Sequence, residues 1–318
     1  MSSALLGNLL SPMILAFILG LGARMAKSDL KVPEPVYQVL SMYLLLAIGL
    51  KGGIELRSAS MADLWRPMLA TLAFGLLAPP LVMLAARRFL GVEREDAASI
   101  AAHYGSVSVV TFIAAKAFME GSGLAVAGVL TALVVLMEVP GIMVGLALGR
   151  GEGKKGDGVL VASADLLRCK GVILLGGGLL IGRFASGTGI EAVKPFFTIA
   201  FPGVLVLFLL EMGLLCGHRL REVMKLGWKL PAFGIAIPIV LGSVGVLLAT
   251  WAGMSTGTAA VFGAMTGSAS YIAAPAAVAH ALPGANPAIS LGLALGISFP
   301  FNLAIGIPLA LELSRLVH

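Results

Sequence analysis

Long apolar runs alternate with short polar connections along the whole chain. Each run comes close to the roughly 20 residues that a helix needs to cross a bilayer. The runs lie near residues 4–23, 35–54, 67–86, 97–117, 123–149, 171–187, 195–216, 230–252, 257–281 and 286–314. This pattern predicts an all-α integral membrane protein with about ten transmembrane helices.

Two of these runs have a composition unlike the others. Runs 97–117 and 257–281 are rich in Gly, Ala, Ser and Thr and poor in Leu. The second run also contains Pro275, whose ring excludes a normal helical hydrogen bond. We therefore expect both helices to be interrupted.

Composition and charge placement agree with a membrane protein. Hydrophobic residues make up 58% of the 318 residues and charged residues 12%, with a mean hydropathy of +1.00. A soluble domain has about 25% charged residues. Most of the 22 Lys and Arg residues fall in the odd-numbered connections between the runs. Because cytoplasmic loops are enriched in Lys and Arg, we expect these connections in the cytoplasm and both termini outside.

The second half of the chain repeats landmarks of the first half at an offset of about 163 residues. Gly49, Trp65 and Gly105 recur in the same order as Gly213, Trp228 and Gly267. We expect a first five-helix repeat at 1–150, a polar cytoplasmic linker at 151–170 and a second five-helix repeat at 171–318. Five spans per repeat is an odd number, so the second copy enters the membrane from the opposite side and the repeats are inverted.

The two unusual runs occupy equivalent places in the two halves, where inverted-repeat transporters bind their substrate. The N-termini of broken helices offer free N–H groups and a positive dipole end, which can hold an anion. Glycine lets a ligand approach the backbone, and hydroxyls donate to oxyanions or coordinate hard cations. The candidate substrate-binding residues are Gly105, Ser106, Ser108, Gly267, Ser268 and Ser270. Such residues also serve helix packing, but their recurrence in both halves favours a site.

Ionisable residues within the apolar runs are a second signal, because charge at the bilayer centre is costly. Glu138 stands two residues before Pro140. It could be a ligand for a coupling ion, a cap on a broken helix, or a structural partner for a freed backbone N–H. Lys116 could be a fixed cation near the site, but we favour a side chain that extends to the membrane interface. We interpret His103 as a hydrogen-bonded core residue rather than a titrating group.

Short motifs are spread over nearly the whole chain. They are Val32-Pro33-Glu34 and the stretches 48–57, 105–111, 137–140, 282–287, 296–300 and 305–308. In order and spacing they resemble the sodium-dependent bicarbonate transporter family of cyanobacterial type. The resemblance implies ten spans in two inverted repeats, sorted into core and gate domains, in a homotrimer of the bacterial inner (cytoplasmic) membrane. It also implies that the core moves against the gate, as in an elevator mechanism.

The resemblance further implies where the ligands bind. Bicarbonate and sodium would bind in the core, where the fourth and ninth helices are interrupted, at the six residues named above and Thr111. Cyanobacterial members also bind a small PII-like signalling protein on the cytoplasmic face, but the linker here is short for the family. The family has an aspartate for sodium where this chain has Tyr271. Fewer anionic ligands weaken a hard-cation site, so we expect altered sodium coupling, with Thr111, Glu138 and Tyr271 as ion-site candidates.

These patterns predict a function without enzymatic chemistry. The chain has no Walker loop, no His-Glu-x-x-His motif and no protease-like Ser/Asp frame. We expect a secondary transporter of bicarbonate, or a similar small anion, that works by alternating access with sodium as the possible coupling ion and needs no other cofactor. The alternatives are a transporter of another small carboxylate and a membrane receptor that binds an anion without moving it.

Overall fold

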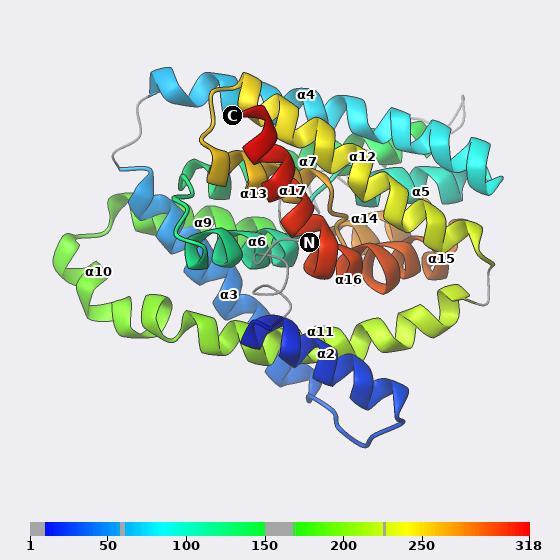
Figure 1. The fold of residues 1–318 in the computed structure, drawn as a ribbon, viewed down its shortest axis with the longest axis horizontal. Helices are drawn as coiled ribbons and strands as arrows, with labels where there is room; N and C mark the ends of the chain where they lie inside the picture. The colour runs from blue at the N-terminus through cyan, green and yellow to red at the C-terminus, as the bar shows by residue number, and fades with distance from the viewer. Residues whose placement is uncertain (1–9, 58–60, 150–167, 169, 225–226) are drawn as a thin grey trace.

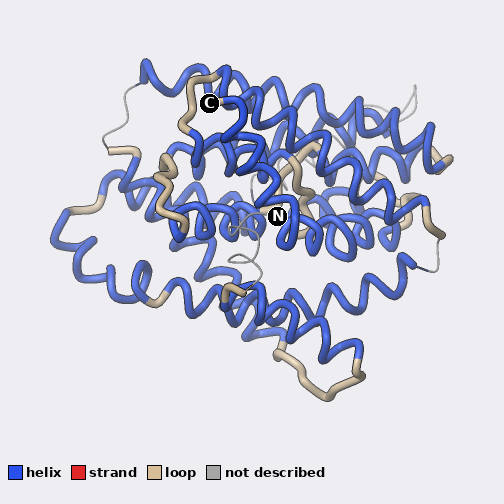
Figure 2. The backbone as a smooth tube through the Cα atoms, in the orientation of Figure 1, coloured by secondary structure: helices blue, strands red, loops and turns tan. Residues whose placement is uncertain are grey.

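The computed structural model describes residues 10–57, 61–149, 168, 170–224 and 227–318. Within these ranges the regular structure is helical throughout (Figures 1 and 2). The helices are α2 (Pro12–Met25), α3 (Glu34–Glu55), α4 (Met61–Ala85), α5 (Arg94–Tyr104), α6 (Val109–Gly121), α7 (Val129–Gly149), α9 (Lys170–Phe184), α10 (Gly187–Lys194), α11 (Phe201–Met224), α12 (Lys229–Trp251), α13 (Thr256–Thr266), α14 (Ala273–Ala281), α15 (Pro287–Leu291), α16 (Phe299–Phe301) and α17 (Ile307–Val317). The wider π-helical turns are η1 (Ala86–Leu90), η2 (Pro195–Ile199), η3 (Gly292–Ser298) and η4 (Asn302–Gly306).

Much of this helical chain is suited to a membrane. In the described part, seven helical stretches are long and apolar enough to cross a bilayer, and α2 is a shorter apolar helix. The all-helical membrane fold expected from the sequence is therefore confirmed. The predicted linker, 151–170, lies outside the described residues except for Arg168 and Lys170.

Both unusual runs are interrupted, as predicted. The first divides into α5 and α6 around residues 105–108, and the second divides into α13 and α14 around residues 267–272. Pro275 is not the cause of the second break, because it lies in the first turn of α14. A proline there removes an N–H group that has no helical acceptor anyway, so it is compatible with a helix start.

The helices pack in two groups. The paired-helix group consists of α2, α3, α9, α10 and α11, in which α2 packs along α11 and α3 along α9. The broken-helix group consists of α4–α7 and α12–α17, in which α5 and α13 pack against their neighbours α4, α7, α12 and α17. In Figure 1, α2 and α11 lie along the lower edge of the molecule, and α4 and α12 lie along the upper edge.

Glycines allow the two close pairs in the paired-helix group. A Cβ atom on Gly53 of α3 would lie 2.1 Å from the carbonyl oxygen of Leu179 on α9. A Cβ atom on Gly213 of α11 would lie 2.1 Å from the carbonyl oxygen of Phe17 on α2. The glycines repeated between the two halves thus mark the places where helix backbones touch.

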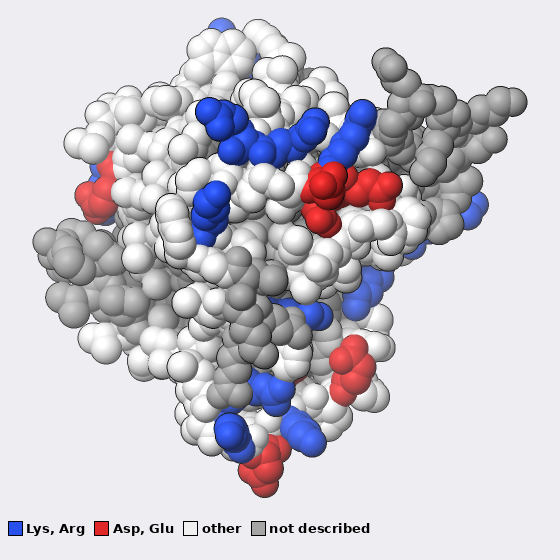
Figure 3. Space-filling model, turned by 90° about the vertical axis from the view of Figure 1, so that its right-hand side faces the viewer, with Lys and Arg blue, Asp and Glu red and all other residues white. Residues whose placement is uncertain are grey.

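Basic side chains gather at one end of the molecule. Figure 3 views the right-hand end of Figure 1, where several Lys and Arg side chains lie together. Exposed Arg87 and Arg88 stand at the end of the α4 stretch, beside the start of α12, since the rings of Phe89 and Trp228 are 6.1 Å apart. The charge pattern predicts that such a basic face lies in the cytoplasm, which stays a prediction.

Candidate functional site

The two breaks lie against each other in the interior of the protein. The backbone N–H of Ser108 donates to Oγ of Ser268 at 2.8 Å. The backbone N–H of Ser270 donates to the carbonyl oxygen of His103 at 2.8 Å. We call residues 105–111 and 267–273 together the crossing. Segments about 163 residues apart in the sequence therefore form one buried polar centre.

Two helices begin at the crossing. α6 starts after Ser108, whose Oγ accepts the N–H of Thr111 at 3.1 Å. α14 starts after residue 272, and Oγ of Ser270 accepts the N–H of Ala274 at 3.3 Å. The first N–H groups of a helix have no acceptor within it. Those of Val109 and Val110 have no acceptor among the described residues and remain available. The positive ends of both helices thus meet at the crossing and favour an anion there.

The breaks press closely on two proline-containing helices. A Cβ atom on Gly105 would lie 2.3 Å from Cγ of Pro79 on α4. A Cβ atom on Gly267 would lie 2.7 Å from the carbonyl oxygen of Pro238 on α12. Both glycines therefore permit a close backbone approach that any larger residue would prevent.

The hydroxyl groups at the crossing divide into two kinds. Those of Ser108, Ser268 and Ser270 are engaged, since Oγ of Ser268 also donates to the carbonyl oxygen of Met265 at 2.6 Å. Those of Ser106 and Thr111 are fully buried, and within the described structure neither has a hydrogen-bond partner. Because buried polar atoms are nearly always paired, these two hydroxyls are the best placed to bind a ligand.

Tyr271, the third ion-site candidate, also faces the crossing. Its hydroxyl lies close to the side chain of Ser108 but makes no hydrogen bond of normal geometry among the described residues. Its ring packs edge-on against Phe299 at a centroid distance of 5.4 Å. A neutral phenol thus stands at the crossing, where it can offer a donor or a weak oxygen ligand.

Glu138 lies at the level of the first break. Along α7, Gly145 contacts Ala102 and Gly141 contacts Gly105, so α7 runs antiparallel to α5. Glu138 lies one turn earlier on this face of α7. Its side chain is 2% exposed, and Oε2 has no hydrogen-bond partner in the described structure. This oxygen is therefore available to a ligand.

The sequence as a whole matches one known family. Residues 12–315 match the profile of the Na+-dependent bicarbonate transporter superfamily. The chain belongs to the Na+-dependent bicarbonate transporter superfamily. A comparison with curated proteins finds no match. Family membership and the apolar helices together support a multi-pass membrane transporter rather than an enzyme.

Bicarbonate transporters of this superfamily depend on sodium, so the oxygen atoms of the crossing are relevant to a cation as well. Within the described ranges no three His, Cys, Asp or Glu side chains cluster as they would around a transition metal. Sodium is a hard cation that takes oxygen ligands. Glu138 carries a carboxylate and Thr111 a hydroxyl, which are oxygen groups of the kind that sodium takes.

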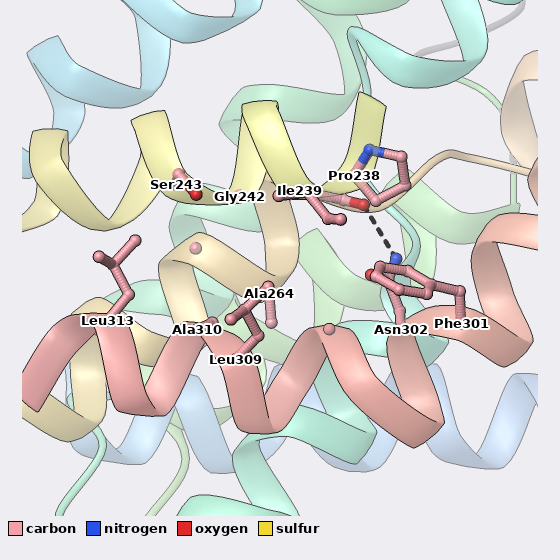
Figure 4. A pocket seen from close by; sticks show the side chains of 13 residues that line it. Pro238, Ile239, Gly242, Ser243, Ala264, Phe301, Asn302, Leu309, Ala310 and Leu313 are labelled. Carbon is pink, nitrogen blue, oxygen red and sulfur yellow. Dashed lines mark hydrogen bonds between the residues drawn. The ribbon is translucent and has the colours of Figure 1, made fainter. Parts of the chain in front are cut away.

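Sequence reasoning missed a polar residue that supports the second break. Nδ2 of Asn302 donates to the carbonyl oxygen of Gly267 at 2.9 Å. The same residue borders a cavity of about 20 Å³, which lies between α12, α13 and the last helix (Figure 4). The signal was present, because Asn302 is a buried amide within the apolar run 286–314. Its partner is a main-chain carbonyl, which no residue pattern reveals.

Lys116 and His103 are both buried in the structure. Lys116 is 4% exposed and pairs with Glu55, so the prediction that its side chain extends to the interface is wrong. The ring Nδ1 of His103 lies 2.7 Å from the carbonyl oxygen of Ser99, which fits a hydrogen-bonded core residue. Its carbonyl group is part of the crossing, and Nε2 of its buried ring has no hydrogen-bond partner among the described residues.

Proposed function

We propose that this protein is a secondary transporter that moves bicarbonate across the cytoplasmic membrane by alternating access. The observation that carries the proposal is the crossing, where two helix N-termini meet beside the hydroxyls of Ser106 and Thr111, which have no partner in the described part of the chain. Bicarbonate is a small oxyanion that takes donors from several directions, and this centre offers N–H and O–H donors without a basic side chain. Gly105 and Gly267 would let the anion approach the backbone, and Ser108, Ser268 and Ser270 would hold the breaks in shape.

The proposed coupling ion is sodium. Glu138 and Thr111 would supply its ligands, and Tyr271 would stand in the place of the family's aspartate. With one anionic ligand fewer, we propose weaker sodium coupling than the family pattern implies. Replacement of sodium by choline would then lower bicarbonate uptake only partly, and a complete loss of uptake would contradict weak coupling.

The architecture that we propose has ten spans in two inverted repeats, 1–150 and 171–318, joined by a cytoplasmic linker at 151–170. The packing of helices between the two halves supports two inverted repeats. In one pair α2 of the first half lies along α11 of the second, and in the other α3 of the first half lies along α9 of the second. The paired-helix group would form the gate and the broken-helix group the core. We also propose a homotrimer with both termini outside. A PII-like regulator would have to bind without a long linker.

Uptake of labelled bicarbonate into proteoliposomes tests the proposed site. Ser106→Ala and Thr111→Ala each remove a hydroxyl that has no partner among the described residues. Each is expected to lower uptake by about tenfold or more, since a hydrogen bond to a charged group contributes about 1.5–3 kcal/mol. Ser290→Ala is the matched control, because Ser290 is also buried without a partner in the described structure but lies on α15.

The possible outcomes separate the alternatives. Wild-type uptake in both variants would place the substrate elsewhere. Uptake of acetate in preference to bicarbonate would indicate a transporter of short carboxylates. Binding of bicarbonate without any flux would indicate a receptor.

A further inference from the structure

An ion pair joins two helices that belong to different groups. The Nζ atom of Lys116, on α6 of the broken-helix group, lies 3.2 and 3.3 Å from the carboxylate oxygens of Glu55. Glu55 ends α3 of the paired-helix group. Glu120, one turn further along α6, lies 3.7 Å from the same ammonium group. Among the described residues, Lys116 therefore has one partner in each group, and the nearer partner is the one across the interface.

Around this ion pair the two helix groups meet through small residues in close contact. Gly128 has no side chain at a place where a Cβ atom would lie 2.1 Å from Oε2 of Glu55. One turn earlier on α3, a Cβ atom on Gly52 would lie 2.5 Å from Cβ of Thr131 on α7. The hydroxyl of Thr131 is buried and makes no hydrogen bond with any described residue. The ion pair thus supplies polar attraction where the two groups otherwise meet through small residues.

Burial makes the pair sensitive to movement between the groups. The side chain of Lys116 is 4% exposed, whereas that of Glu55 is 36% exposed. A buried ammonium group is costly unless a carboxylate compensates for its lost hydration. Glu120 moves with Lys116 because both lie on α6, but Glu55 does not. A displacement of one group along the other would therefore take away the nearer partner.

We infer that Lys116 and Glu55 form a latch that holds the two helix groups in the conformation of this structure and opens in each transport cycle. The inference rests on the proposed alternating access and adds the contact that sets the balance between conformations. Glu120 retains part of the compensation for Lys116 while the latch is open. Glu120 therefore lowers the barrier to opening, while the pair between Lys116 and Glu55 still stabilises the closed conformation.

Distances between the groups test the latch. Spin labels are attached at Ser122→Cys after α6 and Thr188→Cys in α10, both exposed, in full-length protein whose Cys169 and Cys216 are replaced by alanine. Pulsed electron resonance in proteoliposomes without substrate gives the distance distribution. Glu55→Gln is expected to lower the ratio of the closed to the open population by about tenfold. The reason is that it removes the cross-group partner of a buried charge.

Glu120→Gln is the matched control, since it removes the same charge near the same lysine but on the same helix. It is expected to leave the ratio within about twofold, as for a more exposed i, i+4 pair. Gly128→Ala keeps every charge but displaces Glu55, so it is expected to shift the ratio in the same direction as Glu55→Gln.

Three results would overturn the latch. They are a wild-type distribution for Glu55→Gln, an equal shift for Glu120→Gln, and a wild-type distribution for Gly128→Ala. Because these distances are measured without substrate, a failure of bicarbonate uptake would refute the proposed transport and leave the test of the latch valid.

Discussion

Ser106 and Thr111 differ from Ser108, Ser268 and Ser270 because their side chains have no hydrogen-bond partner within the described structure. The sequence predicted the segments that contain them, since a Gly-Ser motif recurs in both halves. It did not distinguish them from Ser108 and Ser268, which hold the breaks together. That distinction depends on main-chain donors and acceptors from the opposite segment, and residue types do not encode where those groups point. Candidate residues were predictable, but their separate tasks were not.

A substitution at Glu138 can distinguish a role in binding the coupling ion from a structural role. Glu138→Gln keeps the shape of the side chain and removes its charge. If Glu138 binds the coupling ion, the sodium concentration for half-maximal bicarbonate uptake is expected to rise at least about tenfold, because a charged ligand is lost from a buried site. The measurement is uptake into proteoliposomes over a range of sodium concentrations.

The control for this prediction is Glu312→Gln, since Glu312 is 43% exposed and pairs with Arg315 on its own helix. It should leave the sodium dependence unchanged. If Glu138→Gln showed the sodium dependence of the wild type, Glu138 would have a structural role. In that role the amide of glutamine can make the same hydrogen bonds.

At the scale of helices, the repeated glycines explain how the paired-helix group is assembled. Gly49 and Gly53 of α3 face the backbone of α9, and Gly213 of α11 faces the backbone of α2. In a membrane, where lipid removes the hydrophobic force between helices, such close contact supplies the packing energy. The sequence predicted that these glycines recur, but which helix each one touches follows only from the three-dimensional arrangement.

Addition of one methyl group is enough to test this packing. Gly53→Ala and Gly213→Ala would each place a Cβ atom 2.1 Å from a backbone oxygen, a clash that only a shift of the helices can relieve. We expect each variant to lose about 1–3 kcal/mol of stability and to melt at a lower temperature in detergent. Gly177→Ala is the control, since nothing lies within 4 Å of the added atom. Equal melting temperatures for all three variants would show that the contacts of α3 and α11 are not close.

For the whole molecule, the apolar pattern predicted most of the architecture. It predicted membrane helices and both interruptions, because burial in lipid or protein leaves a strong compositional signal. It was less successful with individual features that depend on neighbours. Pro275 begins a helix rather than breaking one, since only a proline beyond the first turn removes a helical bond. Lys116 remains buried because Glu55 arrives from another helix, about 60 residues earlier in the sequence.

The direction of the chain in the membrane is the remaining prediction, and it tests the inverted repeat. The basic end of the molecule should face the cytoplasm. The connection between α2 and α3, which contains Ser28, should then lie inside, whereas Ser122 of the first half and Thr188 of the second should both lie outside. In intact cells, a membrane-impermeant maleimide should label Ser122→Cys and Thr188→Cys, and Ser28→Cys only after permeabilisation. All three variants carry alanine at both native cysteine positions, so other labelling is excluded. Labelling of Ser122→Cys and Thr188→Cys from opposite sides would contradict inverted five-helix repeats, and the reverse labelling of all three would contradict the charge rule for this chain.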